Sequence, residues 1–239
     1  PILPIYSTFL QRAYDQIIND LCINNSNALI LVYRASIYGN KDMTHLGFND
    51  ITMLSNMPNL MYLAPTTVEE LESSIRYGVE HHNHPIAIRI PVGSPIYETS
   101  QSNTTECPVT SCNITQSGNT IAIIGVGNFY HKAVELSHAI HDAIHILPTL
   151  VKPLCISSLD TDTLNELTKN HNIVITLEDG ELEGGYGQKI ASYYGKTSMN
   201  VLNYGISKQF YDRYNPEDVL QQNHLDFEHI LDDIQNIQH

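Results

Sequence analysis

Short apolar runs alternate along the chain with longer amphipathic stretches, and this alternation limits the possible folds more than any other feature of the sequence. Apolar runs of this kind suit buried strands, while the intervening stretches have the apolar spacing of helices that cover a sheet. Strands that alternate with helices are typical of βα units on a parallel sheet. The pattern therefore predicts an α/β protein.

The apolar runs predict strands at Ile2–Tyr6, Ala28–Tyr33, Leu60–Leu63, Pro85–Ile90, Thr120–Gly125, Ile144–Leu150, Ile173–Leu177 and Met199–Asn203. The amphipathic stretches predict helices at Ser7–Leu21, Thr67–Tyr77, Asn128–Asp142, Asp160–Asn170, Gly187–Tyr194 and Pro216–Ile234. Between Ser94 and Asn119 the periodicity gives way to Ser, Thr and Asn, which indicates an inter-domain connection. We therefore expect two three-layer α/β/α domains with mainly parallel sheets, at residues 1–94 and 120–239, joined by a linker at 95–119. The first domain is expected to be N-terminally incomplete, because its first element is already a buried-looking strand.

Charge and composition exclude several classes of protein. The chain has 26 Asp and Glu against 12 Lys and Arg, a net charge of −14, whereas nucleic-acid-binding proteins normally present a basic surface. No apolar run approaches the roughly 20 residues that span a bilayer. The four cysteines are scattered without zinc spacing, which favours a reducing, cytoplasmic setting. His131, His138 and His141 share a polar helix face, so we expect a solvated surface and no metal site there.

The segment that starts at Tyr6 passes from a predicted strand into a predicted helix. Ligands of open parallel sheets bind beyond the carboxyl ends of the strands, which is where the aromatic residues and Arg12 of this segment would lie. A competing interpretation is that apolar residues at helical spacing, Phe9 and Ala13 among them, pack on the sheet. Periodicity alone favours packing for Phe9.

Several motifs follow one another in order along nearly the whole chain: YSTFLQRAYDQ at residues 6–16, Arg34-Ala35, Thr44-His45-Leu46-Gly47, Arg89-Ile90-Pro91, Val151-Lys152-Pro153-Leu154 and Glu183-Gly184-Gly185-Tyr186-Gly187. Together they resemble the C-terminal portion of the 1-deoxy-D-xylulose-5-phosphate synthases, thiamin-diphosphate enzymes of the transketolase superfamily. The resemblance implies part of a pyrimidine-binding domain followed by a transketolase C-terminal-like domain.

The resemblance also implies roles for individual residues. Phe9 would stack on the aminopyrimidine ring of the cofactor, with Arg12 close by, because an electron-poor heterocycle favours an aromatic face. Tyr6 and Arg34 would face the phosphate of glyceraldehyde 3-phosphate, which a guanidinium binds well. His45 would lie beside the reacting centre as a proton donor or hydrogen-bonding group, a role that suits its near-neutral pKa.

The activity implied is that of a transferase that condenses pyruvate with D-glyceraldehyde 3-phosphate, in isoprenoid and thiamine biosynthesis, as a homodimer with thiamin diphosphate and Mg²⁺. In that family a glutamate activates the cofactor, and a Gly-Asp-Gly motif binds its metal and diphosphate. No Glu precedes Glu69 in this sequence, and Glu178-Asp179-Gly180 lies in the C-terminal domain, where it is no counterpart of that motif. We therefore expect both cofactors to need the N-terminal portion of the same enzyme, and this piece alone to be inactive.

Three positions depart from the family pattern. Val92 replaces an arginine of Arg-x-Pro-Arg-Gly, and the loss of that charge-assisted contact costs about 1.5–3 kcal/mol. Tyr33 replaces an Asp, and Lys41 is a candidate replacement for the missing phosphate charge. These departures leave two alternatives open: a non-catalytic relative that serves as a binding or scaffolding protein, or one subunit of a split transketolase-like enzyme.

Overall fold

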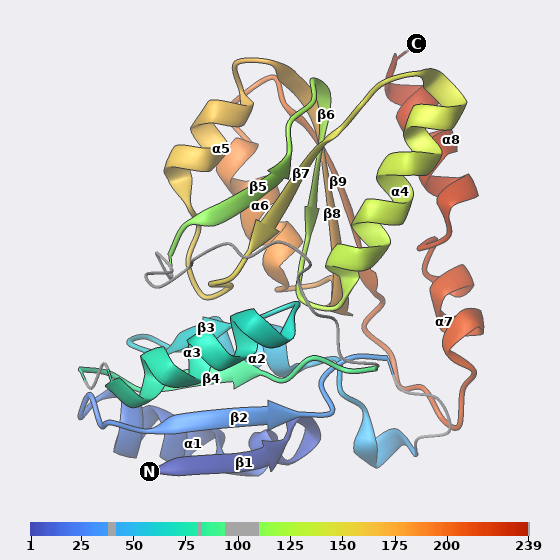
Figure 1. Ribbon diagram of the computed structural model, residues 1–239. Coiled ribbons are helices and arrows are strands. Elements are labelled where there is room, and N and C mark those ends of the chain that lie inside the picture. Colours follow the sequence, from blue (N-terminus) through green and yellow to red (C-terminus); the bar gives the residue numbers. More distant parts are fainter. Residues whose placement is uncertain (38–41, 81–82, 94–109, 239) are drawn as a thin grey trace.

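The computed structural model describes residues 1–37, 42–80, 83–93 and 110–238, which fold into two α/β units stacked end to end (Figure 1). We call residues 1–93 the N-terminal unit and residues 110–238 the C-terminal unit. Each unit contains a mainly parallel sheet with helices on both faces. The predicted fold class is therefore confirmed.

The N-terminal unit is built on a four-stranded parallel sheet in the order β1-β2-β4-β3. The strands are β1 (Ile2–Tyr6), β2 (Leu29–Tyr33), β3 (Met61–Leu63) and β4 (Ile86–Arg89). The helical segments are α1 (Tyr14–Gln16), α2 (Asp50–Leu54) and α3 (Val68–Glu80), with 3₁₀ turns at Ser7–Ala13 and Met43–His45 and a π-helical turn at Ile17–Cys22. Strands β2 and β4 are continuous apolar runs because helices bury both faces of this sheet.

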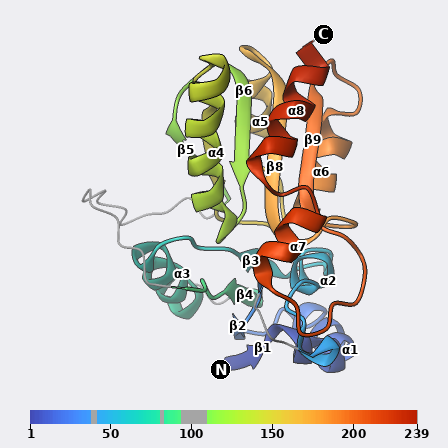
Figure 2. The same ribbon diagram turned by 90° about the vertical axis from the view of Figure 1, so that its right-hand side faces the viewer.

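The C-terminal unit contains a five-stranded sheet in the order β5-β7-β6-β8-β9, in which only β5 runs antiparallel to its neighbour. Its strands are β5 (Cys112–Gln116), β6 (Thr120–Gly125), β7 (Thr149–Pro153), β8 (His171–Glu181) and β9 (Asn200–Ile206). Its helices are α4 (Phe129–Ile144), α5 (Thr161–Leu167), α6 (Tyr186–Tyr194), α7 (Pro216–Gln222) and α8 (Phe227–Gln238). Helices α4 and α8 cover one face and α5 and α6 the other (Figures 1 and 2). No helix in the described ranges has the length and apolar character that crossing a membrane requires.

Several segments of the C-terminal half differ from the prediction. The strand expected at Ile144–Leu150 begins only at Thr149, because α4 continues to Ile144 and ends at His145 in a left-handed conformation. The helix expected at Pro216–Ile234 is divided into α7 and α8, with a second left-handed residue, His224, between them. Strand β5 lies inside the stretch that was expected to be a linker. The polar pattern of β5 concealed it, because this edge strand leaves the side chains of its three central residues, 113–115, exposed.

Two segments of the N-terminal half also differ. The helix expected at Ser7–Leu21 is a chain of 3₁₀, α and π turns, and neither Ser7 nor Thr8 caps it with a side chain. The short helix α2 was not predicted at all, since five residues are too few for a helical period to be recognised. Both differences lie in the segments that follow β1 and β2. Contacts within the fold, which helical periodicity does not reveal, determine the conformation of these segments.

Direct contacts join the two units. Edge strand β3 is extended by the C-terminal unit through an antiparallel bridge between Leu63 and Cys155. The buried ammonium of Lys152, on β7, lies 2.6 Å from a carboxylate oxygen of Glu70 on α3. The C-terminal unit is thus packed directly against the N-terminal sheet and completes one of its edges.

Candidate functional site

Two aromatic rings stand at the carboxyl end of β1. Tyr6 is the last residue of the strand, and Phe9 lies in the 3₁₀ turn that follows it. Their rings stack with centroids 5.9 Å apart and planes 20° apart. Tyr6 is 41% exposed and Phe9 is half-buried, so the pair offers aromatic surface to solvent at the strand end where ligands of parallel sheets bind.

Two guanidinium groups lie over these rings. The Cζ atom of Arg34 is 4.9 Å from the centroid of the Tyr6 ring, and that of Arg12 is 5.6 Å from the Phe9 ring. Both arginines are exposed, and contacts of this kind are worth about 0.5–1 kcal/mol each at exposed sites. That small energy leaves both cations available to an anionic ligand.

The main chain holds Arg34 in an unusual conformation. Its φ of +53° lies in the left-handed region, which a residue with a side chain adopts only when its surroundings impose it. The main chain at Gly47 imposes this conformation. The Gly47 carbonyl accepts the Ser36 N–H at 2.9 Å. A Cβ at Gly47 would lie 2.2 Å from the Arg34 carbonyl oxygen, so only glycine allows the two segments to come this close. The close approach of a glycine therefore ties the Arg34 turn to the segment that carries His45.

His45 approaches the aromatic pair from that second segment. Its ring meets the Phe9 ring edge to face, with centroids 5.6 Å apart and planes 75° apart. The Nδ1 atom of His45 lies 2.9 Å from Oγ1 of Thr44, and the hydroxyl of Thr8 donates to the Thr44 carbonyl at 2.9 Å. Because Nδ1 has this partner, Nε2 is the ring nitrogen left to face a ligand.

The structure thus brings five of the six residues named from the sequence into one exposed cluster, which we call the aromatic–guanidinium cluster: Tyr6, Phe9, Arg12, Arg34 and His45. The sixth, Lys41, lies outside the described residues. Phe9 is half-buried, and its ring contacts those of Tyr6 and His45. The roles of these residues remain predictions.

The cluster fits one end of the cofactor that the resemblance implies. A flat aminopyrimidine can lie against the half-buried Phe9 ring, with the Arg12 guanidinium beside it. The other end needs a metal ion and a diphosphate site, and within the described ranges no group of three or more His, Cys, Asp or Glu residues is placed to hold a metal. The described residues therefore suit the heterocycle but not the metal-bound diphosphate.

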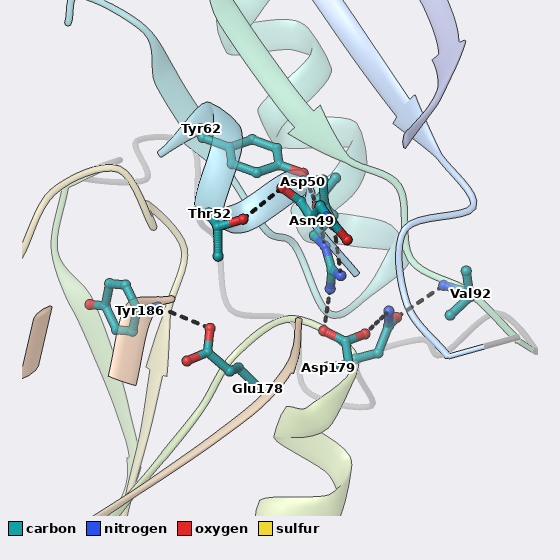
Figure 3. Close-up of polar contacts among 10 residues, drawn as sticks. Asn49, Asp50, Thr52, Tyr62, Val92, Glu178, Asp179 and Tyr186 are labelled. Atoms are coloured by element: carbon teal, nitrogen blue, oxygen red, sulfur yellow. Dashed lines mark hydrogen bonds and ion pairs between the residues drawn. The ribbon is translucent and has the colours of Figure 1, made fainter. Parts of the chain in front are cut away.

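A buried ionic network joins the two units and was not predicted. The Arg89 guanidinium, at the end of β4, donates through Nε to Asp50 at 2.7 Å and through Nη1 to Asp179 on β8. All three side chains are at most 2% exposed. Tyr62 donates its hydroxyl to Asp50, and Asn128 donates to Asp179 at 3.0 Å (Figure 3).

The two carboxylates keep Arg89 charged. Burial by itself lowers the pKa of Arg89, but Asp179 and Asp50 outweigh burial and raise that pKa well above its ordinary value. In the sequence, Arg89 was noted only as part of the Arg-x-Pro-Arg-Gly pattern, which was interpreted as phosphate-binding. Nothing in one sequence indicates that Arg89 meets a partner 90 residues away.

Val92 stands where the resemblance implies a phosphate-binding arginine, and a main-chain hydrogen bond holds it in place. The N–H of Val92 donates to the side-chain oxygen of Asn128 at 3.0 Å, and Asn128 in turn contacts Asp179 (Figure 3). Tyr33, the other described departure from the family pattern, ends β2 and is 37% exposed. The side chains at these two positions supply no cation for a phosphate.

The main-chain N–H groups at the end of the loop that follows β8 donate to a side chain of this chain, Glu178. Glu178, fully buried on β8, accepts the backbone N–H groups of Tyr186 and Gly187 at 2.9 Å each, at the start of α6 (Figure 3). Burial raises the pKa of Glu178 to about 7, against the two amides, which lower it. A carboxylate of the chain thus occupies this helix N-terminus, which agrees with a packing role for the loop.

Glu178 gives a pH-dependent contribution to stability that can be measured. Its pKa is higher in the folded state than the ordinary 4.5, so Glu178 stabilises the fold fully below pH 4.5 and loses that contribution as the pH rises through about 7. We expect the unfolding free energy of the unaltered chain, relative to Glu178→Gln, to fall by about 3 kcal/mol across this window. Urea unfolding at a series of pH values measures it, with exposed Glu72→Gln as the control. A difference that does not vary with pH would disprove this assignment.

A groove between the two units is the main rival to the cluster. Two adjoining hollows, of about 470 and 580 Å³, share Ser157 and Ser158 in their walls. The cation in the described lining is Lys189, whose ammonium already donates to the carbonyl and hydroxyl oxygens of Ser55 at 2.8 and 2.9 Å. Since no carboxylate stands in the described walls, the groove offers less chemistry than the cluster.

Comparison with known proteins agrees with this arrangement. Residues 1–94 match the family described as "Transketolase, pyrimidine binding domain", and residues 110–230 match "Transketolase, C-terminal domain". Similar curated proteins are 1-deoxy-D-xylulose-5-phosphate synthases. The one from Clostridium tetani is 31% identical over 99% of this chain and 38% of its own length. The one from Clostridium acetobutylicum is 35% identical over 96% of this chain and 37% of its own length.

A solved structure described as "Split gene transketolase, inactive beta4 tetramer" has a similar fold, with a TM-score of 0.84. It is 20% identical, and the match covers 99% of this chain and 75% of that one. This likeness concerns the fold. The present chain spans little more than a third of the length of the curated relatives that it matches.

Proposed function

Because this chain belongs to the transketolase family, we propose that it is the C-terminal part of a thiamin-diphosphate-dependent synthase that condenses pyruvate with D-glyceraldehyde 3-phosphate to 1-deoxy-D-xylulose 5-phosphate. The observation that carries the proposal is the aromatic–guanidinium cluster, in which side chains from three separate segments meet. The names of the similar curated proteins support the choice of substrates.

Each residue of the cluster has a task in this proposal. Phe9 holds the aminopyrimidine by its ring face, with Arg12 at its edge. Arg34 and Tyr6 bind the phosphate of the acceptor aldehyde, Arg34 through its planar fork of N–H donors. His45 holds a proton near the acceptor carbonyl. When bound, thiamin diphosphate supplies the carbon nucleophile that takes up the two-carbon unit of pyruvate as carbon dioxide leaves.

The remaining requirements are assigned to the complete protein. Mg²⁺, the diphosphate site and the glutamate that activates the cofactor need residues other than those of this chain. In the proposal this chain alone is therefore inactive. The complete enzyme would be a cytoplasmic homodimer that serves isoprenoid and thiamine biosynthesis.

Two other functions have some support. Val92 and Tyr33 leave the expected phosphate site with fewer partners, which favours a non-catalytic relative that binds or scaffolds. The similar structure described as a split-gene transketolase favours a subunit that works with a second chain. The synthase is preferred because the cluster retains both the heterocycle-binding and the proton-bearing residues.

Thiamin diphosphate titration tests the proposal. We expect the complete protein to bind the cofactor with Mg²⁺ in a calorimeter and to release carbon dioxide from pyruvate. Phe9→Ala is expected to weaken binding by roughly 10- to 100-fold, since stacking of a base on an aromatic ring is worth about 1–3 kcal/mol. Phe210→Ala is the matched control, because that phenylalanine is 83% exposed and lies in the C-terminal unit.

The outcomes separate the candidate functions. No heat of binding and no decarboxylation from the complete protein would reject the synthase in favour of the non-catalytic relative. Binding that arises only after a second, co-purified chain is added would indicate the split enzyme. Equal affinity in Phe9→Ala and the unaltered protein would remove Phe9 from the cofactor site.

A further inference from the structure

We propose that the C-terminal unit fixes the position of His45 against Phe9, so that Asp179, Arg89 and Phe48 act as positioning residues of the site. The segment concerned is residues 42–49, which we call the His45 loop. The proposal rests on the proposed function for the importance of His45. The contact that it describes exists with or without a bound cofactor.

The main chain of the His45 loop is attached to the C-terminal unit. The Phe48 carbonyl accepts the N–H of Glu181, at the end of β8, at 3.0 Å. The neighbouring Gly180 allows this approach, because a Cβ there would lie 3.2 Å from the same carbonyl and 3.1 Å from the Ile51 side chain. Strand β8 therefore directly contacts the loop three residues beyond His45.

Two apolar side chains of the loop are buried among residues of the C-terminal unit. Leu46 and Phe48 belong to the hydrophobic cluster that includes strands β6, β8 and β9. The Phe48 ring, 1% exposed, lies edge to face against Tyr211 with centroids 5.5 Å apart, and it also contacts Tyr214 at 5.8 Å. Leu46 and Phe48, one on each side of Gly47, thus anchor the loop in the core of the C-terminal unit.

The buried ionic network fixes the end of the loop. Asp50 begins helix α2 directly after the loop, and it receives two N–H groups from Arg89, at 2.7 and 3.4 Å. The same guanidinium donates to Asp179 of the C-terminal unit. Because a guanidinium is planar and rigid, the position of Asp179 sets where Arg89 holds Asp50.

The other members of the cluster are positioned differently. Tyr6, Phe9, Arg12 and Arg34 all follow β1 or β2 and depend on the N-terminal sheet. The His45 loop also contacts those segments, through the Thr8 hydroxyl on Thr44, the Ser36 amide on Gly47 and the ring pair of His45 and Phe9. In the proposal, the distance between His45 and Phe9 therefore depends on how the C-terminal unit docks on the N-terminal unit as well as on these local contacts.

Nuclear magnetic resonance of the full chain tests this proposal without cofactor. The chain is labelled in its histidine and phenylalanine rings, and His45 and Phe9 are assigned from the spectra of His45→Gln and Phe9→Leu. We expect a cross-peak between the two rings in the unaltered chain. Asp179→Asn is expected to weaken or abolish this cross-peak and to shift the His45 ring signals. The exposed Asp142→Asn, in the same unit, is expected to change neither.

Phe48→Leu provides an independent variant, since it keeps an apolar side chain and removes the ring contacts with Tyr211 and Tyr214. It decides the question if Asp179→Asn does not fold, and it is expected to move the His45 signals as well. A folded Phe48→Leu with an intact cross-peak and unshifted His45 signals would overturn the proposal, as would the absence of the cross-peak from the unaltered chain. Failure of thiamin diphosphate to bind would reject the proposed function and leave this result standing.

Discussion

Replacing Arg89 with Met is expected to lower the free energy of unfolding by about 3–5 kcal/mol. The substitution removes the guanidinium that lies between Asp50 and Asp179 and leaves two carboxylates buried without a counter-ion. Methionine fills much of the space of the aliphatic stem, so most of the loss comes from uncompensated charge. Urea unfolding of the chain at neutral pH, followed by circular dichroism, measures the change.

Two further variants make this result specific. Arg76→Met on α3 removes an exposed arginine, so we expect a change within about 0.5 kcal/mol. Adding Asp50→Asn and Asp179→Asn to Arg89→Met is expected to restore part of the lost stability, because no unpaired charge is then buried. A loss below about 1 kcal/mol for Arg89→Met alone would contradict a fully buried, paired arginine.

The central strands were predictable because their sequence pattern arises from burial itself. Strand β6 has the predicted bounds, β2 begins one residue later than predicted, and β4 is one residue shorter than predicted at each end. Each lies inside a sheet covered on both faces, which requires a continuous apolar run. Strand β5 lies at an edge with three consecutive residues exposed, so its composition resembles that of a loop. Apolar patterning thus found these central strands and the apolar edge strand β1, but it missed the polar edge strand β5.

The loops that form the site could not be predicted from apolar patterning. The residues of the aromatic–guanidinium cluster were named from motif resemblance, and spacing alone would have assigned Phe9 to packing. The turns around Phe9 and His45 are 3₁₀ and π segments without an α-helical period, held by contacts such as Thr8 on Thr44. Gly47 is the one local signal, since a glycine is required where two main-chain segments touch.

The ionic network could not be predicted from the sequence in physical terms. Asp50 begins α2, Arg89 ends β4 and Asp179 lies in β8, so Arg89 is 39 residues from Asp50 and 90 residues from Asp179. A charged residue in a single sequence is most simply assigned to the surface, because buried charges require partners that only the fold supplies. Tertiary contact between the two units therefore decided both their burial and their pairing.

Replacing His45 with Gln is expected to reduce the kcat of the complete enzyme by about 100- to 10,000-fold, the range that a positioned proton donor contributes. Glutamine has a similar size and keeps a hydrogen-bonding amide, but it cannot give up a proton at neutral pH. The affinity for thiamin diphosphate is expected to stay unchanged, since the proposed function assigns that contact to Phe9 and Arg12. His138→Gln, on the exposed face of α4, is the matched control.

The most direct test of whether the reaction takes place at the ends of β1 and β2 is the steady-state rate of product formation from pyruvate and glyceraldehyde 3-phosphate. This rate is measured for His45→Gln, for His138→Gln and for the unaltered enzyme. The account predicts a loss of about 100-fold or more in His45→Gln alone, with the cofactor still bound. Equal rates in all three proteins would contradict it and place the reacting centre elsewhere.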